Sequence, residues 1–81
     1  HLVGSKLLVE ISQLIRGSIR NYDYAFRYGG DEFVVVLPNT DSQDARLVAE
    51  RIRSRIEKAD FLVYQKHYKV TVSVGVATFP D

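Results

Sequence analysis

Two adjacent glycines, Gly29 and Gly30, constrain the fold of this chain more than any other feature of its sequence. Aromatic residues alternate before them over 24–28, and a largely β-branched run follows them within 32–37. This arrangement is typical of a β-hairpin, because glycine accepts the positive φ angles of tight primed turns. We therefore predict a hairpin with strands over these two ranges and a two-residue Gly-Gly turn.

Two carboxylates, Asp31 and Glu32, follow the glycines directly. A turn without side chains lets a ligand approach the backbone closely. Carboxylates beside such an opening can bind a hard cation, and the cation can bind a phosphate. By spacing alone, a structural hairpin whose acidic residues only solvate the turn is the more common outcome. These residues by themselves leave both interpretations open.

Composition narrows the classes of function. The 81 residues are enough for one small domain, and the net charge of +1 gives no strong attraction to nucleic acid or to a membrane surface. The chain has no cysteine, which excludes disulfides and cysteine-ligated zinc. No apolar run approaches the length of a membrane span. We expect a globular domain without nucleic-acid or membrane contact.

The remaining periodicity predicts helices and further strands. Ser5 is a candidate cap for a helix over 6–18, and Thr40 with Gln43 forms a potential capping box before a helix over 41–59. Alternating valines indicate a strand over 68–79, and a shorter strand is expected over 61–64. The order is helix, strand, strand, helix, strand, strand. One more strand before the first helix would complete a ferredoxin-like unit.

Read together, Gly29-Gly30-Asp31-Glu32-Phe33 is the signature of GGDEF domains, and the chain resembles this family of diguanylate cyclases along essentially its whole length. Further matching segments are His1-Leu2-Val3-Gly4 with Leu7-Leu8, Arg20-Asn21-Tyr22-Asp23, 49–53 and 70–77. The resemblance implies an α+β fold of the ferredoxin-like, nucleotidyl-cyclase palm type. It also implies that residues 1–81 are a partial domain. The strand carrying another metal ligand and the last helix and strand would lie outside it.

The resemblance implies that two GTP molecules are joined into cyclic di-GMP, with release of pyrophosphate, between the subunits of a head-to-head homodimer. Asp31 and Glu32 would be the catalytic and metal-binding residues, with Mg²⁺ or Mn²⁺ as cofactor. Gly29 and Gly30 would lie against the nucleotide. We expect the 81-residue segment alone to be inactive, because further oxygen ligands and the basic residues for the triphosphate fall outside it.

Ser5 departs from the family pattern. It stands where the family usually has an aspartate that hydrogen-bonds the guanine edge, so the resemblance makes it a substrate-binding position. Serine cannot accept two base N–H groups as a carboxylate does, and losing a charged acceptor costs on the order of 1–3 kcal/mol. This substitution predicts weaker selection of guanine.

Arg20 and Asp23 match the inhibitory RxxD motif of the family, just before the first hairpin strand, and Arg51 resembles an arginine that completes the site in some members. Arginine offers a planar fork for phosphate or guanine, and aspartate accepts guanine N–H groups. The resemblance implies a product-binding site that gives feedback inhibition by cyclic di-GMP. The alternative is a surface ion pair worth a fraction of a kcal/mol, about 0.2–1.

Two other functions remain open. The chain could be a degenerate GGDEF domain that binds GTP or cyclic di-GMP without turnover, which Ser5 favours, or a dimerisation domain using the hairpin and a helix. Turnover by the full-length protein distinguishes catalysis from a binding module without turnover. Titration with cyclic di-GMP distinguishes that binding module from a dimerisation domain. Family context places such domains in the cytoplasm, in bacterial signalling proteins that can be membrane-anchored through other segments.

Overall fold

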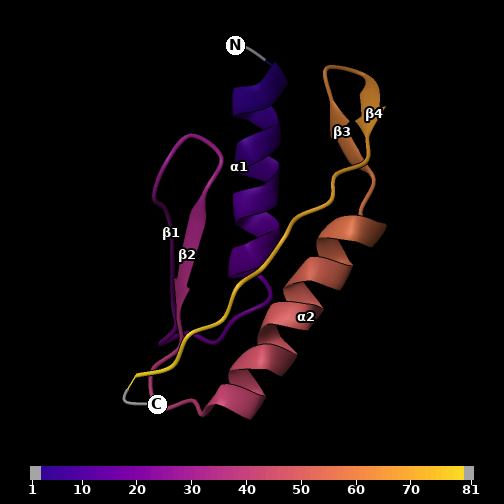
Figure 1. Cartoon of the computed structure of the whole chain (residues 1–81). Helices are drawn as coiled ribbons and strands as arrows, with labels where there is room; N and C mark the ends of the chain where they lie inside the picture. Colours follow the sequence, from indigo (N-terminus) through magenta and orange to yellow (C-terminus); the bar gives the residue numbers. More distant parts are fainter. Residues whose placement is uncertain (1–2, 80–81) are drawn as a thin grey trace.

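The computed structural model describes residues 3–79, which form two helices and two β-hairpins. The elements are α1 (Val3–Arg16), β1 (Tyr24–Arg27), β2 (Phe33–Val36), α2 (Ser42–Lys58), β3 (Phe61–Val63) and β4 (Lys66–Tyr68). Figure 1 shows α1 between the β1–β2 hairpin and α2, while the segment after β4 runs back along the molecule toward the start of α2. This arrangement confirms the predicted α+β class.

Helix α1 buries the face that its apolar periodicity predicts. Ile11 and Ile15, one turn apart, are both buried. The helix begins at Val3, so the prediction that Ser5 caps it is wrong: Ser5 lies inside the first turn. Serine disfavours the helix interior only weakly, so the helix extends past it. The C-terminal end falls at Arg16, two residues before the predicted end at position 18.

Strands β1 and β2 pair antiparallel, with Tyr24 opposite Val36 and Arg27 opposite Phe33. Directly opposed residues share one face of a sheet, and successive residues alternate between faces. The face that packs against the core carries Ala25, Phe33 and Val35. The face that is exposed carries Tyr24, Phe26 and Val36. The hairpin is therefore confirmed, and it is covered on one side only in the described part of the chain.

The predicted two-residue primed turn at the end of this hairpin is wrong. The segment Tyr28–Glu32 connects the strands, and neither Gly29 nor Gly30 has a positive φ. The N–H groups of Tyr28 and Gly29 both donate to the Glu32 carbonyl, at 2.8 and 3.4 Å. The ladder ends at the pair Arg27–Phe33, so the connection is long enough to avoid the left-handed region. The φ angles therefore do not explain why positions 29 and 30 are glycines.

Helix α2 begins after a different cap from the one predicted. The Asp41 side chain accepts the N–H of Asp44 at 2.8 Å, which makes Asp41 the N-cap. The expected box of Thr40 and Gln43 is wrong, because the Thr40 hydroxyl donates to the Pro38 carbonyl at 3.0 Å. Aspartate and threonine are both good caps, so the sequence alone could not choose between adjacent positions.

The hydrophobic core lies where the two helices meet β3. Its buried members are Ile11, Ile15, Ile52, Ile56 and Phe61. Ile56 on α2 and Val63 on β3 are the largest fully buried side chains of the described residues, each 1% exposed. The core-facing side of the first hairpin packs against this cluster, so the position of the loop Tyr28–Glu32 depends on it.

Strands β3 and β4 form a second, tighter hairpin. Val63 pairs with Lys66, which leaves Tyr64 and Gln65 as a two-residue turn. Both turn residues have positive φ, 49° and 66°. A primed turn of this kind favours Asn-Gly, since other residues with a Cβ are strained there. The primed geometry that the glycine pair predicted for the first hairpin thus occurs in the second, without a glycine.

Replacing Tyr64-Gln65 by Asn-Gly is expected to raise the free energy of unfolding by about 1 kcal/mol, because it removes strain from both positive-φ positions. Urea denaturation of the protein measures the change. Lys66→Gly is the control: Lys66 lies in β4 without a positive φ, so glycine there should destabilise by about 0.5–1 kcal/mol. A lower denaturation midpoint for the Asn-Gly variant would contradict the turn geometry.

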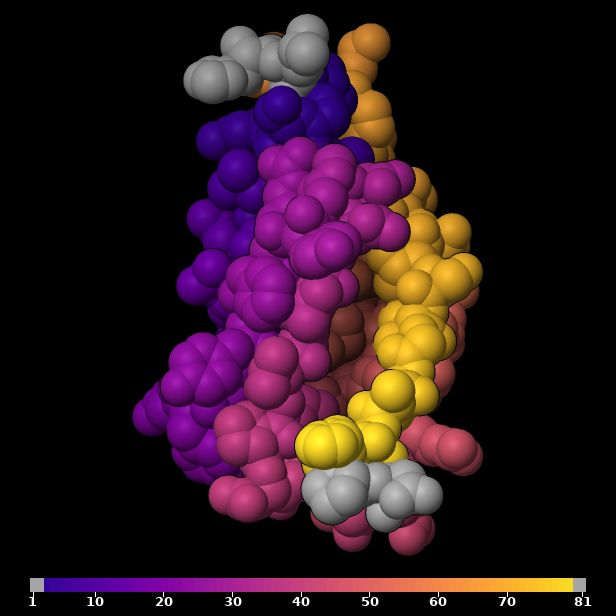
Figure 2. Space-filling view, turned by 60° about the vertical axis from the view of Figure 1, so that its left-hand side comes forward, coloured from indigo at the N-terminus to yellow at the C-terminus, as the bar shows by residue number. Residues whose placement is uncertain are grey.

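The predicted strand over 68–79 is wrong beyond Tyr68. From position 69 onward the chain runs without a ladder partner among the described residues, and the strands form two separate two-stranded sheets. Val70 and Val72 still pack against the core, whereas Val74 and Val76 are 46% and 42% exposed. A ladder needs a neighbouring strand about 4.8 Å away. Here a groove lies between β2 and this segment (Figure 2), so no ladder forms.

Candidate functional site

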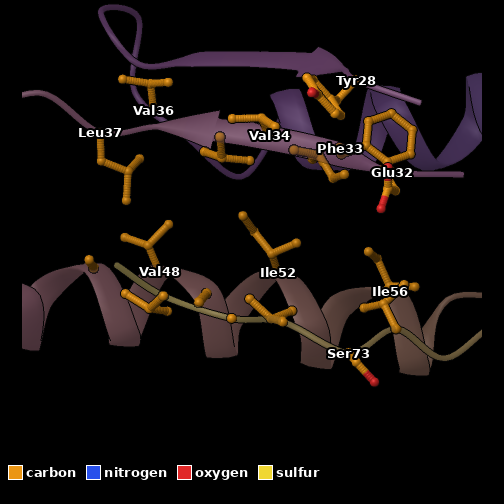
Figure 3. Close-up of a pocket in the computed structure, with 18 of the residues that line it drawn as sticks. Tyr28, Glu32, Phe33, Val34, Val36, Leu37, Val48, Ile52, Ile56 and Ser73 are labelled. Atoms are coloured by element: carbon orange, nitrogen blue, oxygen red, sulfur yellow. The ribbon is translucent and has the colours of Figure 1, made fainter. Parts of the chain in front are cut away.

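The loop between β1 and β2 carries two adjacent exposed carboxylates, Asp31 and Glu32. Among residues 3–79, neither takes part in an ion pair. Both lie at the lining of the groove, and in Figure 3 the Glu32 side chain points into the space between β2 and α2. Two carboxylates without a cationic partner, facing an open space, are groups of the kind that can bind a hard divalent cation.

The groove itself is large and mostly apolar. Its volume is about 1650 Å³, with β2 on one side and residues 70–79 on the other; α1, α2 and the segments flanking β2 contribute the rest of the lining. Figure 2 shows α2 at the bottom of the opening between the hairpin and the C-terminal segment. Small-molecule pockets occupy roughly 300–1,000 Å³. The apolar part therefore suits a polypeptide segment better than a nucleotide. Acidic residues line the groove at both ends of β2: Asp31 and Glu32 before it, and Asp41 after it.

The two glycines of the loop differ in their surroundings. A Cβ at Gly29 would lie 2.8 Å from Oε1 of Glu32, the mobile end of a side chain. A Cβ at Gly30 would meet no atom within 4 Å. No contact inside the described chain therefore accounts for glycine at position 30. Close approach by a ligand supplies a reason for it.

The donor set for a metal is of the right kind but incomplete. Asp31 and Glu32 offer the oxygen ligands that Mg²⁺ prefers. Within residues 3–79 no group of three or more His, Cys, Asp and Glu side chains could hold a metal ion. A cation bound here would need further oxygen ligands from a phosphate or from outside the described residues.

Ser5 lies on α1, whose first turn borders the groove. It is exposed on the first turn of α1, next to Gly4, which lines the groove while Ser5 itself does not. Residues 1–2, the start of the segment that resembles the family's helix start, lie outside the described residues.

Arg20 and Asp23 form a close, multiply bonded pair. Nε and one terminal nitrogen of Arg20 each donate to an Asp23 oxygen at 2.9 Å, and the Arg20 backbone N–H adds a bond of 2.7 Å. The Asp23 side chain is 1% exposed and that of Arg20 is 42% exposed. The hydrogen bonds from Arg20 hold the pKa of the Asp23 carboxyl below its ordinary value. Asp23 thus has a structural role, while the arginine remains accessible.

Arg20 also makes contacts that the sequence did not reveal. A terminal nitrogen donates to the Thr40 hydroxyl at 2.6 Å, and the guanidinium lies 4.6 Å from the centre of the Tyr22 ring. A small cavity of about 280 Å³ adjoins this cluster. Its lining residues are Arg16, Ile19, Arg20, Asn21, Asp23, Tyr24 and Ala25. No sequence signal linked Thr40 to Arg20, because 20 positions separate the two residues.

Arg51 reaches the same end of α1. It donates to the Ser18 carbonyl at 2.7 Å, two residues before Arg20. Arg55, one turn further along α2, donates to the Ser18 hydroxyl at 3.0 Å. The structure therefore brings the third predicted residue of this cluster to the turn that carries the other two. Sequence reasoning missed Ser18 and Arg55, although the spacing of Arg51 and Arg55 places them on one face of a helix.

The lowered pKa of Asp23 predicts a specific pH dependence of stability. The carboxylate stabilises the folded state fully above its unfolded pKa, near 3.8, and this contribution is lost as pH falls through the lower folded pKa. We expect Asp23→Asn to remove that part of the acid dependence in urea denaturation series. The exposed variant Asp44→Asn should retain it. An unchanged acid profile for Asp23→Asn would contradict the assignment.

Comparison with known families gives a clear result. The family model described as "Diguanylate cyclase, GGDEF domain" matches residues 1–81. The chain belongs to the GGDEF domain family. The five signature residues of this GGDEF domain are Gly29, Gly30, Asp31, Glu32 and Phe33, which cover the exposed loop and the first residue of β2.

Curated relatives cover nearly the whole GGDEF domain sequence. Diguanylate cyclase A of Treponema denticola is 42% identical over 79 residues, 98% of this chain and 21% of its own length. Diguanylate cyclase DosC of Escherichia coli K12 is 39% identical over 80 residues, 98% of this chain and 17% of its own. The response regulator PleD of Caulobacter vibrioides is 38% identical over 95% of this chain. The chain thus spans about a fifth of the length of these relatives.

A solved structure shares the fold. The diguanylate cyclase SiaD from Pseudomonas aeruginosa, solved in complex with its activator SiaC, matches 82% of this chain and 25% of its own with a TM-score of 0.73 and 38% identity. The GGDEF diguanylate cyclase family uses GTP, makes cyclic di-GMP and generally depends on divalent metal. Within the described residues, neither helix of this GGDEF domain has the length and apolar character needed to cross a membrane.

Proposed function

We propose that the full-length protein is a diguanylate cyclase, which joins two GTP molecules into one cyclic di-GMP and releases two pyrophosphates. The observation that carries this proposal is the intact signature loop, with Asp31 and Glu32 exposed, without cationic partners and at one end of the groove. Each 3′-hydroxyl attacks the α-phosphate of the other nucleotide, so two such domains face one another in a homodimer. The chemistry requires positioning and charge neutralisation rather than a protein nucleophile.

The residues of the signature loop take different roles in this proposal. Asp31 and Glu32 would hold Mg²⁺ or Mn²⁺, together with phosphate oxygens and a further ligand of the full-length protein. The bound cation would neutralise developing charge on the α-phosphate and favour ionisation of the attacking hydroxyl. Gly30 would lie against the nucleotide, which fits the free space around it. Phe33 packs against the core and anchors the loop at the start of β2.

The groove supports the proposal that residues 1–81 are part of a larger catalytic domain. The edge of β2 that faces away from β1 has no ladder partner among the described residues, and residues 69–79 have none. An additional strand between them would pair with these edges, bury the apolar lining and unite the sheet. A carboxylate on that strand, near Asp31, would add the oxygen ligand that the described residues lack.

The test is product analysis. The full-length protein, incubated with GTP and Mg²⁺, is expected to yield cyclic di-GMP and pyrophosphate in a molar ratio of one to two. The segment 1–81 alone is expected to yield none. Unchanged GTP in the reaction of the full-length protein would contradict the proposed activity, and cyclic di-GMP from the segment alone would contradict the partial-domain proposal.

Arg20, Asp23 and Arg51 form the proposed inhibitory site for the product. The partly exposed Arg20 guanidinium, its position over the Tyr22 ring and the adjoining cavity support recognition of a guanine or a phosphate. Because Asp23 is buried and already bonded to Arg20, binding would require it to exchange an internal partner for the ligand. The site therefore has a structural function even without ligand.

Arg20→Ala in the full-length protein is expected to weaken cyclic di-GMP binding by at least about tenfold in calorimetry, because the ligand loses a charged bidentate donor. Arg53→Ala is the control, since Arg53 pairs with Glu50 and Glu57 on α2 and takes no part in the cluster. Circular dichroism checks that both variants remain folded. Unchanged affinity for Arg20→Ala would refute the product site.

A binding module without turnover is the second candidate function, and Ser5 is the observation that favours it. An exposed serine replaces the carboxylate expected at the guanine edge. In that case the full-length protein would bind GTP or cyclic di-GMP in calorimetry and form no product from GTP. In either function we place the domain in the cytoplasm, where GTP is available, with any membrane anchor supplied by other segments.

A further inference from the structure

Arg27 makes an unusual contact with the signature loop. Its Nε donates to the carbonyl oxygens of both Gly29 and Gly30, at 3.1 and 2.9 Å. Arg27 is the last residue of β1, so its backbone is fixed by the ladder to Phe33. One charged donor thus ties two successive peptide groups of a glycine segment to a rigid strand. Charge-assisted hydrogen bonds of this type are stronger than neutral ones.

This contact also sets the direction of two N–H groups. A trans peptide is planar, so the N–H of each residue points opposite to the preceding carbonyl. With the Gly29 and Gly30 carbonyls turned toward Arg27, the N–H groups of Gly30 and Asp31 point away from it. Neither donates a hydrogen bond to another described residue. Successive backbone N–H groups presented in this way form a binding site for an anion.

We propose that Arg27 is a positioning residue that holds the signature loop so that the N–H groups of Gly30 and Asp31 donate to a phosphate group of the nucleotide. The inference rests on the proposed function for the identity of the ligand. It accounts for glycine at position 30, where a side chain would meet no protein atom but would stand beside an approaching phosphate. The positive charge of Arg27, with a cation held by Asp31 and Glu32, offsets the repulsion between phosphate and carboxylates.

The test uses the full-length protein, labelled with ¹⁵N at glycine and aspartate. Pyrophosphate is added in the presence of Mg²⁺, with Mg²⁺ alone as the baseline. The amide protons of Gly30 and Asp31 are expected to move downfield with pyrophosphate beyond the baseline. In Arg27→Gln, this response should require at least about tenfold more pyrophosphate, and kcat/KM for GTP should fall at least about tenfold.

Two variants distinguish the positioning role of Arg27 from the effect of its positive charge. Arg53→Gln removes the same charge from α2, away from the loop, and should keep the wild-type response within about twofold. Arg27→Lys keeps the charge and a donor, so it should restore part of the response that Arg27→Gln loses. A mere stability defect in Arg27→Gln would lower the melting temperature without changing the pyrophosphate titration of the folded protein.

The outcomes also separate this inference from the proposed function. If the protein makes cyclic di-GMP but the Gly30 and Asp31 amide signals do not shift with pyrophosphate, the inference is overturned and the proposed cyclase function stands. Responsive amides that depend on Arg27, in a protein without turnover, would support the inference and reject catalysis. An Arg27→Gln variant with a wild-type titration and kcat/KM within about twofold of the wild type would overturn the positioning role.

Discussion

Asp31→Asn in the full-length protein is expected to lower kcat for cyclic di-GMP formation by at least about 100-fold, because the variant loses the charge that holds a divalent cation beside the reacting phosphate. Asn keeps the shape of the side chain and one oxygen, so a fall in kcat reflects the lost charge rather than a change in side-chain volume. Asp31 is exposed and takes part in no ion pair among the described residues. The free energy of unfolding should therefore change by less than about 0.5 kcal/mol.

Asp44→Asn provides the matched control for this activity prediction. It makes the same chemical change at an exposed position in the first turn of α2, outside the groove lining. Its kcat should stay within about twofold of the wild type. Turnover is measured as pyrophosphate release with saturating GTP and Mg²⁺. A fully active Asp31→Asn protein would remove the central residue from the proposed mechanism.

Ile56→Ala is expected to lower the free energy of unfolding by about 3 kcal/mol, within the roughly 2–5 kcal/mol range for such truncations. Ile56 is 1% exposed and belongs to the cluster that joins both helices and β3. Its truncation removes buried methyl groups and leaves a cavity that a small core cannot fill. A domain of this size is stable by only about 4–12 kcal/mol, so the loss is a large part of the total.

Two further substitutions calibrate the core prediction in urea denaturation. Ile56→Val removes one methylene and should cost about 0.5–1.5 kcal/mol. Leu47→Ala removes a larger group from the same helix, but Leu47 is 64% exposed, so the change should be below about 0.5 kcal/mol. Equal losses for Ile56→Ala and Leu47→Ala would show that α2 does not pack on the described face.

Local sequence signals predicted the elements well and their ends less well. The apolar stripes of α1 and α2 fix which faces are buried, because 3.6-residue periodicity is a property of the chain itself. The predicted helix caps Ser5 and Thr40 are wrong. Several neighbouring side chains can accept the free N–H groups at the start of a helix, and which of them does so depends on its other hydrogen-bond partners. The primed turn was assigned to the wrong hairpin for a similar reason. The ladder register, rather than the glycine pair, sets the length of each connection.

In the candidate site, too, some features follow from the local sequence and others only from the packing of the elements. The residue order of the signature loop placed Asp31 and Glu32 beside an open turn, as the structure has them. The bonds from Arg20 to Thr40 and from Arg51 to Ser18 join positions 20 and 33 residues apart. Only the packing of α1 against α2 and the first hairpin brings such positions together. No periodicity or motif in a single sequence records these distances.

The family, the two helical faces, the first hairpin and the acidic loop can all be recognised in the amino-acid sequence, because these features depend on neighbours within a few positions. Three features follow only from the packed structure: the segment after Tyr68 has no ladder partner among residues 3–79, Asp23 is buried against Arg20, and the Arg27 side chain reaches both glycine carbonyls. The physical reason is that strand pairing, burial and side-chain reach depend on distances between elements. These distances are set when the helices and hairpins pack around Ile56 and its neighbours.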